Sequence, residues 1–259
     1  MNKAVDERDL VRALTRGLDV ILAFSHHRPR MSLSEVASET GLSRPTARRL
    51  LLTLQQNGYV TTDGRMFALT PRVLALGYAY LSSLNLTHIA QPFMQELMET
   101  TREGVALATL DLPDVVYVTR VSAYQIANMT LATGTRLPAH ATSLGQVLLA
   151  DLAPGALSEY LAKAALQPMT SRTITAPDQL IGRLDQVRAQ GWALVDQELE
   201  EGLRSISAPV RGPNGSVIAA MGLSTTTATV NADRLEHEFL PALLKAAAIT
   251  SAQLGAGYS

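Results

Sequence analysis

The pattern of apolar and polar positions predicts an amphipathic helix near the start of the chain and two shorter helices after it. Within residues 11–24, apolar side chains recur at spacings of three and four, at Leu14, Leu18, Ile21 and Leu22.

The run Ser32-Leu33-Ser34-Glu35 has the form of a capping box that opens a short helix, and Gly41 provides its stop. Ser43 can cap the next helix, which we expect to extend to about Gln56. Two short helices around a tight turn predict a helix-turn-helix.

The second of these helices carries polar groups on the face away from its apolar residues. Arg44 and Arg48 lie one turn apart, and Ser43, Thr46 and Arg49 add hydroxyls and a third guanidinium. Guanidinium groups bind phosphates and guanine edges, and hydroxyls at a helix start bind phosphates. Taken singly, these arginines could simply solvate an exposed helix. In this order of elements they favour a DNA-reading helix.

A hairpin is predicted directly after the helix-turn-helix. The dipeptide Asp63-Gly64 separates the strand-like segments Tyr59–Thr62 and Arg65–Leu69. Such a hairpin is typical of a winged helix-turn-helix, and an arginine at its tip can reach a phosphate or the minor groove. We therefore predict a DNA-binding domain over residues 1–71 whose contacts to double-stranded operator DNA are Ser43, Arg44, Thr46, Arg48, Arg49 and Arg65.

Residues 72–85 are predicted to form a linker helix. Its apolar side chains lie on more than one side, so the helix must be covered by its own chain or by a second subunit. Pairing of two subunits is the favoured reading, because DNA-reading heads usually act in symmetric pairs.

Residues 86–259 predict a second domain that mixes helices and strands. One helical pattern ends near Thr101, and further helical patterns cover 142–150, 154–165, 177–190 and 232–254. Strand-like runs lie between them, at Val105–Leu110, Val115–Val121, Ile126–Leu131, Trp192–Val195, Leu203–Val210 and Ser216–Ser224. Because hairpins are interleaved with helices, we predict an α+β fold with an antiparallel sheet.

Composition and charge narrow the classes of function. The 259 residues include 22 Lys and Arg, 23 Asp and Glu and no Cys, which excludes disulfides and Cys-ligated metal sites. The net charge of −1 divides into +4 over residues 1–80 and −5 over the remainder, as in a DNA-binding head joined to a body that does not bind DNA. No basic-then-apolar leader opens the chain, and the uncharged stretch 73–95 is too polar for a membrane span. We expect a cytoplasmic protein with no membrane partner.

Several segments resemble the IclR family of bacterial transcriptional regulators. They include Leu33-Ser34-Glu35-Val36-Ala37, Gly41-Leu42-Ser43-Arg44-Pro45-Thr46-Ala47-Arg48-Arg49-Leu50 and Leu54-Gln55-Gln56-Asn57-Gly58-Tyr59-Val60. The resemblance implies an N-terminal winged helix-turn-helix, a GAF/PAS-like effector-binding domain and assembly into a homodimer or tetramer.

The segment 134–146 is a glycine-bearing loop that runs into a helix, where free backbone N–H groups can bind a carboxylate. This segment and 200–210 look like the effector-domain signature of the family. The resemblance implies a small carboxylate effector in a pocket lined by Ile126, Met129, Leu137, Ser143, Leu144, Leu203, Ser205 and Ser224, with Asp196 close by. Some members have small residues where Ser143-Leu144 stand, so their effectors do not transfer directly.

Segments 131–139 and 142–150 look most like the regulators of aromatic-acid catabolism through the β-ketoadipate pathway. That similarity implies protocatechuate, 4-hydroxybenzoate, muconate or β-ketoadipate as effectors. The resulting interpretation is a DNA-binding regulator controlled by a small organic acid, with no cofactor, no metal and no catalytic residue.

Two other classes of function are open from the sequence. One is a small-molecule enzyme with an accessory winged helix that uses His140 or Asp196, although the chain has no G-x-S-x-G, Walker, dinucleotide-binding or H-E-x-x-H motif. The other treats the winged helix as a protein-binding module. His26 and His27 are adjacent and have no carboxylate at ligand spacing, so a metal site is not expected.

Overall fold

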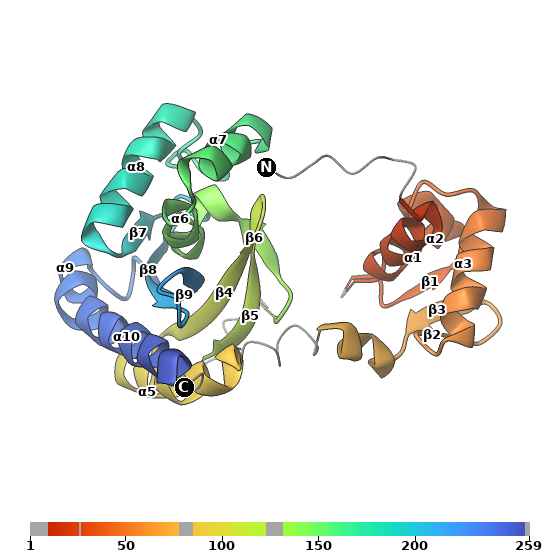
Figure 1. Cartoon of the computed structure of the whole chain (residues 1–259), viewed down its shortest axis with the longest axis horizontal. Helices are drawn as coiled ribbons and strands as arrows, with labels where there is room; N and C mark the ends of the chain where they lie inside the picture. The colour runs from red at the N-terminus through yellow and green to blue at the C-terminus, as the bar shows by residue number, and fades with distance from the viewer. Residues whose placement is uncertain (1–9, 26, 78–84, 123–131, 257–259) are drawn as a thin grey trace. The chain divides into compact units, whose positions relative to one another are not determined.

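The chain folds into two units, Met1–Ser83 and Leu84–Ser259 (Figure 1). The structure is a computed structural model, and it describes residues 10–25, 27–77, 85–122 and 132–256. The first unit consists of α1 (Arg12–Leu22), β1 (Arg30–Ser32), α2 (Leu33–Glu39), α3 (Arg44–Gln56), β2 (Val60–Thr62) and β3 (Met66–Leu69).

The predicted winged helix-turn-helix is confirmed in the first unit. Strands β2 and β3 form the wing, and β1 pairs antiparallel with the outer side of β3 to give the sheet order β1-β3-β2. The sequence did not predict β1, because three residues are too few to show alternation. Its pairing depends on β3, which lies more than thirty residues later in the chain.

Local capping fixes the ends of α2 and α3 as predicted. The Ser32 hydroxyl accepts a hydrogen bond from the Glu35 amide at 3.4 Å, and the Glu35 carboxylate accepts one from the Ser32 amide at 2.7 Å. The Ser43 hydroxyl accepts from the Thr46 amide at 3.4 Å. Gly41 has φ +65°, a left-handed conformation that suits glycine between two helices.

The apolar face of α1 contributes little to the core of its unit. Leu14, Leu18 and Leu22 are 64%, 47% and 78% exposed, whereas Val20 and Phe24 are buried. The amphipathic helix is therefore present, but most of its leucines face outward. The connector is described only in part: residues 71–77 are helical and include exposed Leu74, and the rest lies outside the described residues.

The second unit is an antiparallel α+β domain, as predicted. Its sheet has the order β6-β5-β4-β9-β8-β7. The strands are β4 (Gly104–Asp111), β5 (Asp114–Val121), β6 (Arg136–Pro138), β7 (Ala193–Asp196), β8 (Leu203–Arg211) and β9 (Val217–Thr226). The strand expected at Ile126–Leu131 lies outside the described residues.

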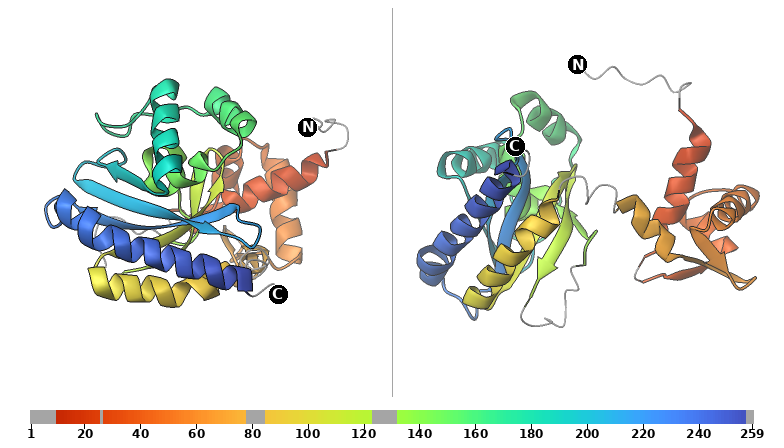
Figure 2. Two further views of the ribbon diagram at one scale, coloured as in Figure 1. Left: turned by 60° about the vertical axis from the view of Figure 1, so that its left-hand side comes forward. Right: turned by 60° about the horizontal axis from the view of Figure 1, so that its bottom comes forward.

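Helices cover both faces of this sheet (Figures 1 and 2). One face carries α6 (Ser143–Ala150), with α7 (Pro154–Lys163) and α8 (Pro177–Gln190) beyond it. The other carries α5 (Leu86–Thr101) and α10 (Leu240–Ala256), which run side by side in Figure 2. Before α10, α9 (Ala232–Arg234) continues into a π-helical turn over Leu235–Phe239.

The helical segment Leu235–Ala256 is long and apolar enough to cross a membrane by length and composition alone. In this fold it packs on α5 and β8, with Leu243, Ala247 and Leu254 buried. Those contacts are typical of the core helix of a globular domain.

Helix α6 approaches its neighbours unusually closely at Gly145. A Cβ atom added there would lie 2.1 Å from the carbonyl oxygen of Ala139 and 2.4 Å from its Cα. Both atoms belong to the backbone, so they cannot swing aside as a side chain would. The segment 139–141 and α6 can pack at this distance only because Gly145 has no side chain.

We predict that Gly145→Ala will lower the free energy of unfolding by about 3 kcal/mol or more, because the added methyl overlaps backbone atoms. The matched control is Gly182→Ala, in the exposed face of α8, where nothing lies within 4 Å of an added Cβ. This control should gain about 0.5–1 kcal/mol through reduced flexibility of the unfolded chain. Chemical denaturation of both variants measures the difference, and equal stabilities would contradict the packing argument.

Candidate functional site

Four of the arginines proposed from the sequence are exposed on the first unit. In the part of the chain that the structure describes, Arg44, Arg48, Arg49 and Arg65 form no ion pair. Elsewhere in the same unit, Arg28 pairs with Glu39 and Arg30 pairs with Asp63. The guanidinium groups on α3 and the wing tip are therefore free to neutralise phosphates or read base edges.

Local hydrogen bonds position the polar groups around these arginines. The Ser43 and Thr46 hydroxyls lie 2.9 Å apart, so Ser43 serves as the cap of α3 and orients Thr46. Thr46 and Arg49 line a groove between α3 and α1, beside Leu14 and Leu18. Arg44 and Arg48 do not line this groove.

The wing tip is fixed by Asp63. Its carboxylate accepts hydrogen bonds from the amides of Arg65 (2.9 Å) and Met66 (2.8 Å), which hold the pKa of Asp63 below its usual value. Gly64 completes the turn with φ +91°. The backbone at Arg65 is therefore held in place while its side chain remains exposed.

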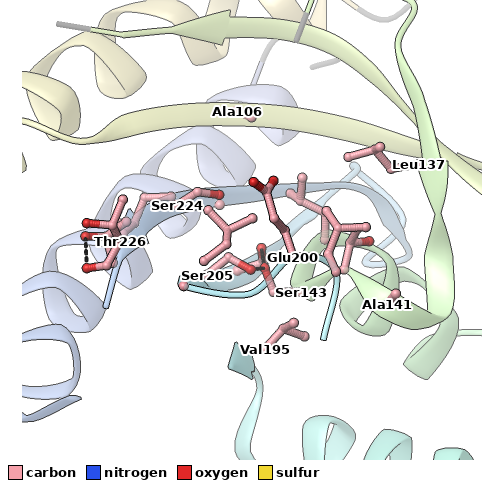
Figure 3. Close-up of a pocket in the computed structure, with 18 of the residues that line it drawn as sticks. Ala106, Leu137, Ala141, Ser143, Val195, Glu200, Ser205, Ser224 and Thr226 are labelled. Carbon is pink, nitrogen blue, oxygen red and sulfur yellow. Dashed lines mark hydrogen bonds between the residues drawn. The ribbon is translucent and has the colours of Figure 1, made fainter. Parts of the chain in front are cut away.

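The second unit contains a cavity of about 310 Å³ between α6 and the sheet (Figure 3). Its volume and largely apolar wall suit a small organic molecule. Six residues proposed from the sequence line it: Leu137, Ser143, Leu144, Leu203, Ser205 and Ser224. Ile126 and Met129, which were also proposed, lie outside the described residues.

Strand register explains which sheet residues line the cavity. Arg120, Ala106, Gly222 and Ser207 form one row across β5, β4, β9 and β8, and all four line it. Side chains in such a row share one face of the sheet. The middle of the row carries only the small residues Ala106 and Gly222, and the Ser207 and Leu144 side chains pack over Gly222.

Three serine hydroxyls form the polar end of the cavity. The Ser143 hydroxyl donates to Ser205 at 3.0 Å and lies 2.7 Å from the Ser207 hydroxyl. A hydroxyl has one proton, so Ser207 donates to Ser143 when Ser143 donates to Ser205. The Ser205 proton is then free to be donated into the cavity. Figure 3 shows Ser143 and Ser205 turned toward one another below Glu200.

The start of α6 adds backbone donors to these hydroxyls. Thr142 caps the helix, because its side chain accepts from the Gly145 amide at 3.0 Å. The amides of Ser143 and Leu144 have no hydrogen-bond partner among the described residues, and both residues line the cavity. Two free N–H groups, the helix dipole and the Ser205 hydroxyl together favour an anionic group at this end.

Asp196, which the family resemblance places close to the ligand, adjoins the cavity wall without lining it. Asp196 does not line the cavity; its neighbour Val195 does, because successive residues of a strand face opposite sides. Asp196 instead binds Arg204 at 2.9 Å and Arg172 at 3.1 Å. The hydrogen bond from Arg204 holds the pKa of Asp196 below its usual value.

His140 and Asp196, the residues that an enzyme would use, do not form a hydrogen-bonded triad with Ser143. His140 Nε2 lies 3.0 Å from the carbonyl oxygen of Gln167, and burial lowers the pKa of His140. Each of the other two side chains is bonded to the partners given above. Within residues 10–25, 27–77, 85–122 and 132–256, no group of three His, Asp or Glu side chains is placed to hold a metal ion.

A buried ion pair supports the loop 199–202 at the edge of the cavity. Arg183 Nη1 lies 3.2 Å from the Glu198 carboxylate, which also accepts from Gln146 Nε2 on α6 at 3.1 Å. Burial raises the pKa of Glu198, and Arg183 opposes that rise. The same Gln146 amide donates to the His140 carbonyl at 3.0 Å. Helix α6 and the loop are thus joined through one carboxylate.

Sequence reasoning missed several residues of the cavity wall. Among them are Tyr117, Arg120, Val195, Glu200, Ser207 and Thr226. The alternation of β8 was a usable signal for one of them, because Ser207 follows Ser205 by two positions. The others depend on register between strands that are distant in sequence.

Comparisons with known proteins agree with this architecture. Residues 13–64 match the IclR helix-turn-helix domain, and residues 78–252 match the C-terminal domain of the bacterial transcriptional regulator IclR. The Pca regulon regulatory protein of Pseudomonas putida is 43% identical over 239 residues, covering 92% of this chain and 82% of that protein. The p-hydroxybenzoate hydroxylase transcriptional activator of Acinetobacter baylyi is 37% identical, with coverages of 93% and 91%.

Among solved structures, an IclR homologue from Microbacterium hydrocarbonoxydans complexed with 4-hydroxybenzoate superimposes with a TM-score of 0.83 at 25% identity. The match covers 94% of this chain and 99% of that chain. The helix-turn-helix match lies in the first unit. The C-terminal domain match covers most of the second unit, which contains the cavity. The chain therefore belongs to the IclR family of bacterial transcriptional regulators.

Proposed function

We propose that this protein binds operator DNA through α3 and the wing and is controlled by a small organic acid bound in the cavity of the second unit. The observation that carries the proposal is the polar end of that cavity, which is lined by Ser143 and Leu144 at the start of α6 and by Ser205, to which Ser143 donates a hydrogen bond. Arg44, Thr46, Arg48 and Arg49 contact the DNA, Ser43 caps their helix, and Arg65 contacts it from the wing.

The regulated genes belong to the catabolism of aromatic compounds. Two relatives support this assignment: the protein that regulates the Pca regulon, and the activator of p-hydroxybenzoate hydroxylase. The homologue complexed with 4-hydroxybenzoate supports an acid as the effector class. The site is built from Leu137, Ser143, Leu144, Leu203, Ser205 and Ser224, whereas Asp196 stabilises the opposite face of β7.

The protein works as a homo-oligomer in the cytoplasm and releases its ligand unchanged. Exposed leucines on α1 and at Leu74 and Leu76 supply apolar surface for pairing two DNA-binding units. The effector shifts the DNA-bound population only if it binds one arrangement of the paired units more tightly.

Replacing Arg48 tests the DNA-binding surface. We expect Arg48→Ala to weaken operator binding by about 1–3 kcal/mol, which is roughly 5- to 150-fold, because an unpaired guanidinium on α3 is lost. Fluorescence anisotropy on an operator selected by the wild-type protein from random duplexes measures the change. Arg28→Ala is the control, since Arg28 is already paired with Glu39. An unchanged affinity for Arg48→Ala would remove this helix from the DNA interface.

Replacing Ser205 tests the polar end of the cavity. We expect Ser205→Ala to weaken binding of benzoate and 4-hydroxybenzoate about 10- to 100-fold, because a charge-assisted hydrogen bond is lost. Isothermal titration calorimetry on the full chain measures the loss. Ser158→Ala, on the exposed surface of α7, is the matched control and should bind as the wild type does. Equal binding by both variants would place the acid elsewhere.

A further inference from the structure

Within the described residues, two arginines of the second unit have no ion pair, Arg102 and Arg120, and of these only Arg120 lines the cavity. Seven arginines that the structure describes there are ion-paired, namely Arg136, Arg172, Arg183, Arg188, Arg204, Arg211 and Arg234. Arg120 is half-buried and lines the cavity, yet it has no hydrogen bond or ion pair within the described residues. A guanidinium that lines a cavity without a partner keeps its N–H donors available for an anionic ligand.

The sheet makes room for this guanidinium at Gly104. A Cβ atom on Gly104 would lie 2.9 Å from Arg120 Nη2 and 3.5 Å from Nε, so the side chain lies over β4 where no neighbouring side chain blocks it. The backbone conformation at position 104 does not require glycine, because φ there is not positive. The lack of a side chain at Gly104 instead lets the Arg120 side chain lie close over β4.

The position of Arg120 is opposite the polar end formed by α6. Along the row Arg120, Ala106, Gly222 and Ser207, the arginine stands on β5 and the serine on β8. With neighbouring strands about 5 Å apart, their backbones are roughly 14 Å apart. The Arg120 side chain spans part of that distance over β4, and a ligand that contacts both ends spans the rest. Between them on β4, Ala106 adds only a methyl group to the cavity wall.

We propose that Arg120 is a second anion-binding point and that the effector is an acid with two separated carboxylates. This inference rests on the proposed function, because the first carboxylate occupies the α6 end. A carboxylate matches the guanidinium in charge and can accept two parallel hydrogen bonds, which a neutral phenol cannot do.

Other groups around the cavity agree with this assignment. Burial raises the pKa of Tyr117 to about 12, although Arg120 opposes the rise, so the phenol keeps its proton at neutral pH and can donate beside Arg120. Glu200 and Glu201 also line the cavity, but both are exposed and their charges are screened by water. Neither forms an ion pair with Arg120.

Matched acids test the second binding point on the full chain by calorimetry. We expect terephthalate to bind at least about 10-fold more tightly than benzoate, and adipate at least about 10-fold more tightly than hexanoate. Arg120→Gln should abolish both differences and leave benzoate and hexanoate within about twofold of wild type. Arg102→Gln is the control, because Arg102 is exposed and does not line the cavity.

Gly104→Ala provides a second variant that keeps the charge. The added methyl displaces the guanidinium, so the advantage of the diacids should shrink without loss of benzoate binding. Diacids that bind no better than their monoacids, or that keep their advantage in Arg120→Gln, would overturn the inference. Tighter binding of 4-hydroxybenzoate than of terephthalate would overturn it as well.

The proposed function fails in a different way. If Ser205→Ala weakens benzoate but the wild type shows no preference for diacids, the cavity is an effector site and Arg120 is not a binding point. If no acid binds the wild type, or if Ser205→Ala changes nothing, then both the proposed function and the second binding point are wrong.

Discussion

The close approach of α6 to the sheet is the contact on which the effector-binding unit depends. Two glycines make it possible. Gly145 lets α6 pack on the backbone of Ala139, and Gly222 leaves space on β9 where a Cβ atom would lie 2.2 Å from the Ser207 hydroxyl and 3.1 Å from the Leu144 side chain. If a side chain at either glycine pushed α6 away from the sheet, the bonds from Ser143 to Ser205 and Ser207, now 3.0 and 2.7 Å, would weaken or break. The geometry of the polar end thus follows from the absence of two side chains.

The anion site proposed at the α6 end includes no cation among the described residues. The donors are backbone amides and hydroxyls, which the fold has already oriented, so they lose little freedom when a ligand binds. The buried pair of Glu198 and Arg183 lies behind the site and does not line the cavity. A fixed positive charge at this end would instead attract carboxylates of the protein itself, in competition with the ligand. The negative charge of the unit as a whole therefore does not prevent binding of an acid.

Local signals in the sequence were sufficient for most of the fold. The capping box at Ser32, the cap at Ser43 and the turn at Asp63-Gly64 each act within a few residues, and each forms the bonds expected of it. The three-residue strands β1 and β6 exist only through partners far along the chain, so no local pattern indicated them. The site was harder to predict for the same reason. A shift of one position along β7 exchanges Val195 for Asp196, and only the pairing of β7 with β8 decides which of them faces the cavity.

The arginines show how one residue type serves two purposes in this chain. Where an arginine stabilises the fold, a carboxylate from the same unit meets it, as Asp196 meets Arg204 and Asp111 meets Arg136. Where binding is proposed, on α3, on the wing and at Arg120, no carboxylate among the described residues is such a partner. An arginine that is already paired must break that contact before it can bind a phosphate or a ligand carboxylate, and the exchange yields little net free energy. Leaving a guanidinium unpaired keeps its interaction energy for the ligand. Position matters as well, because the exposed Arg102 also has no ion pair within the described residues and does not line the cavity.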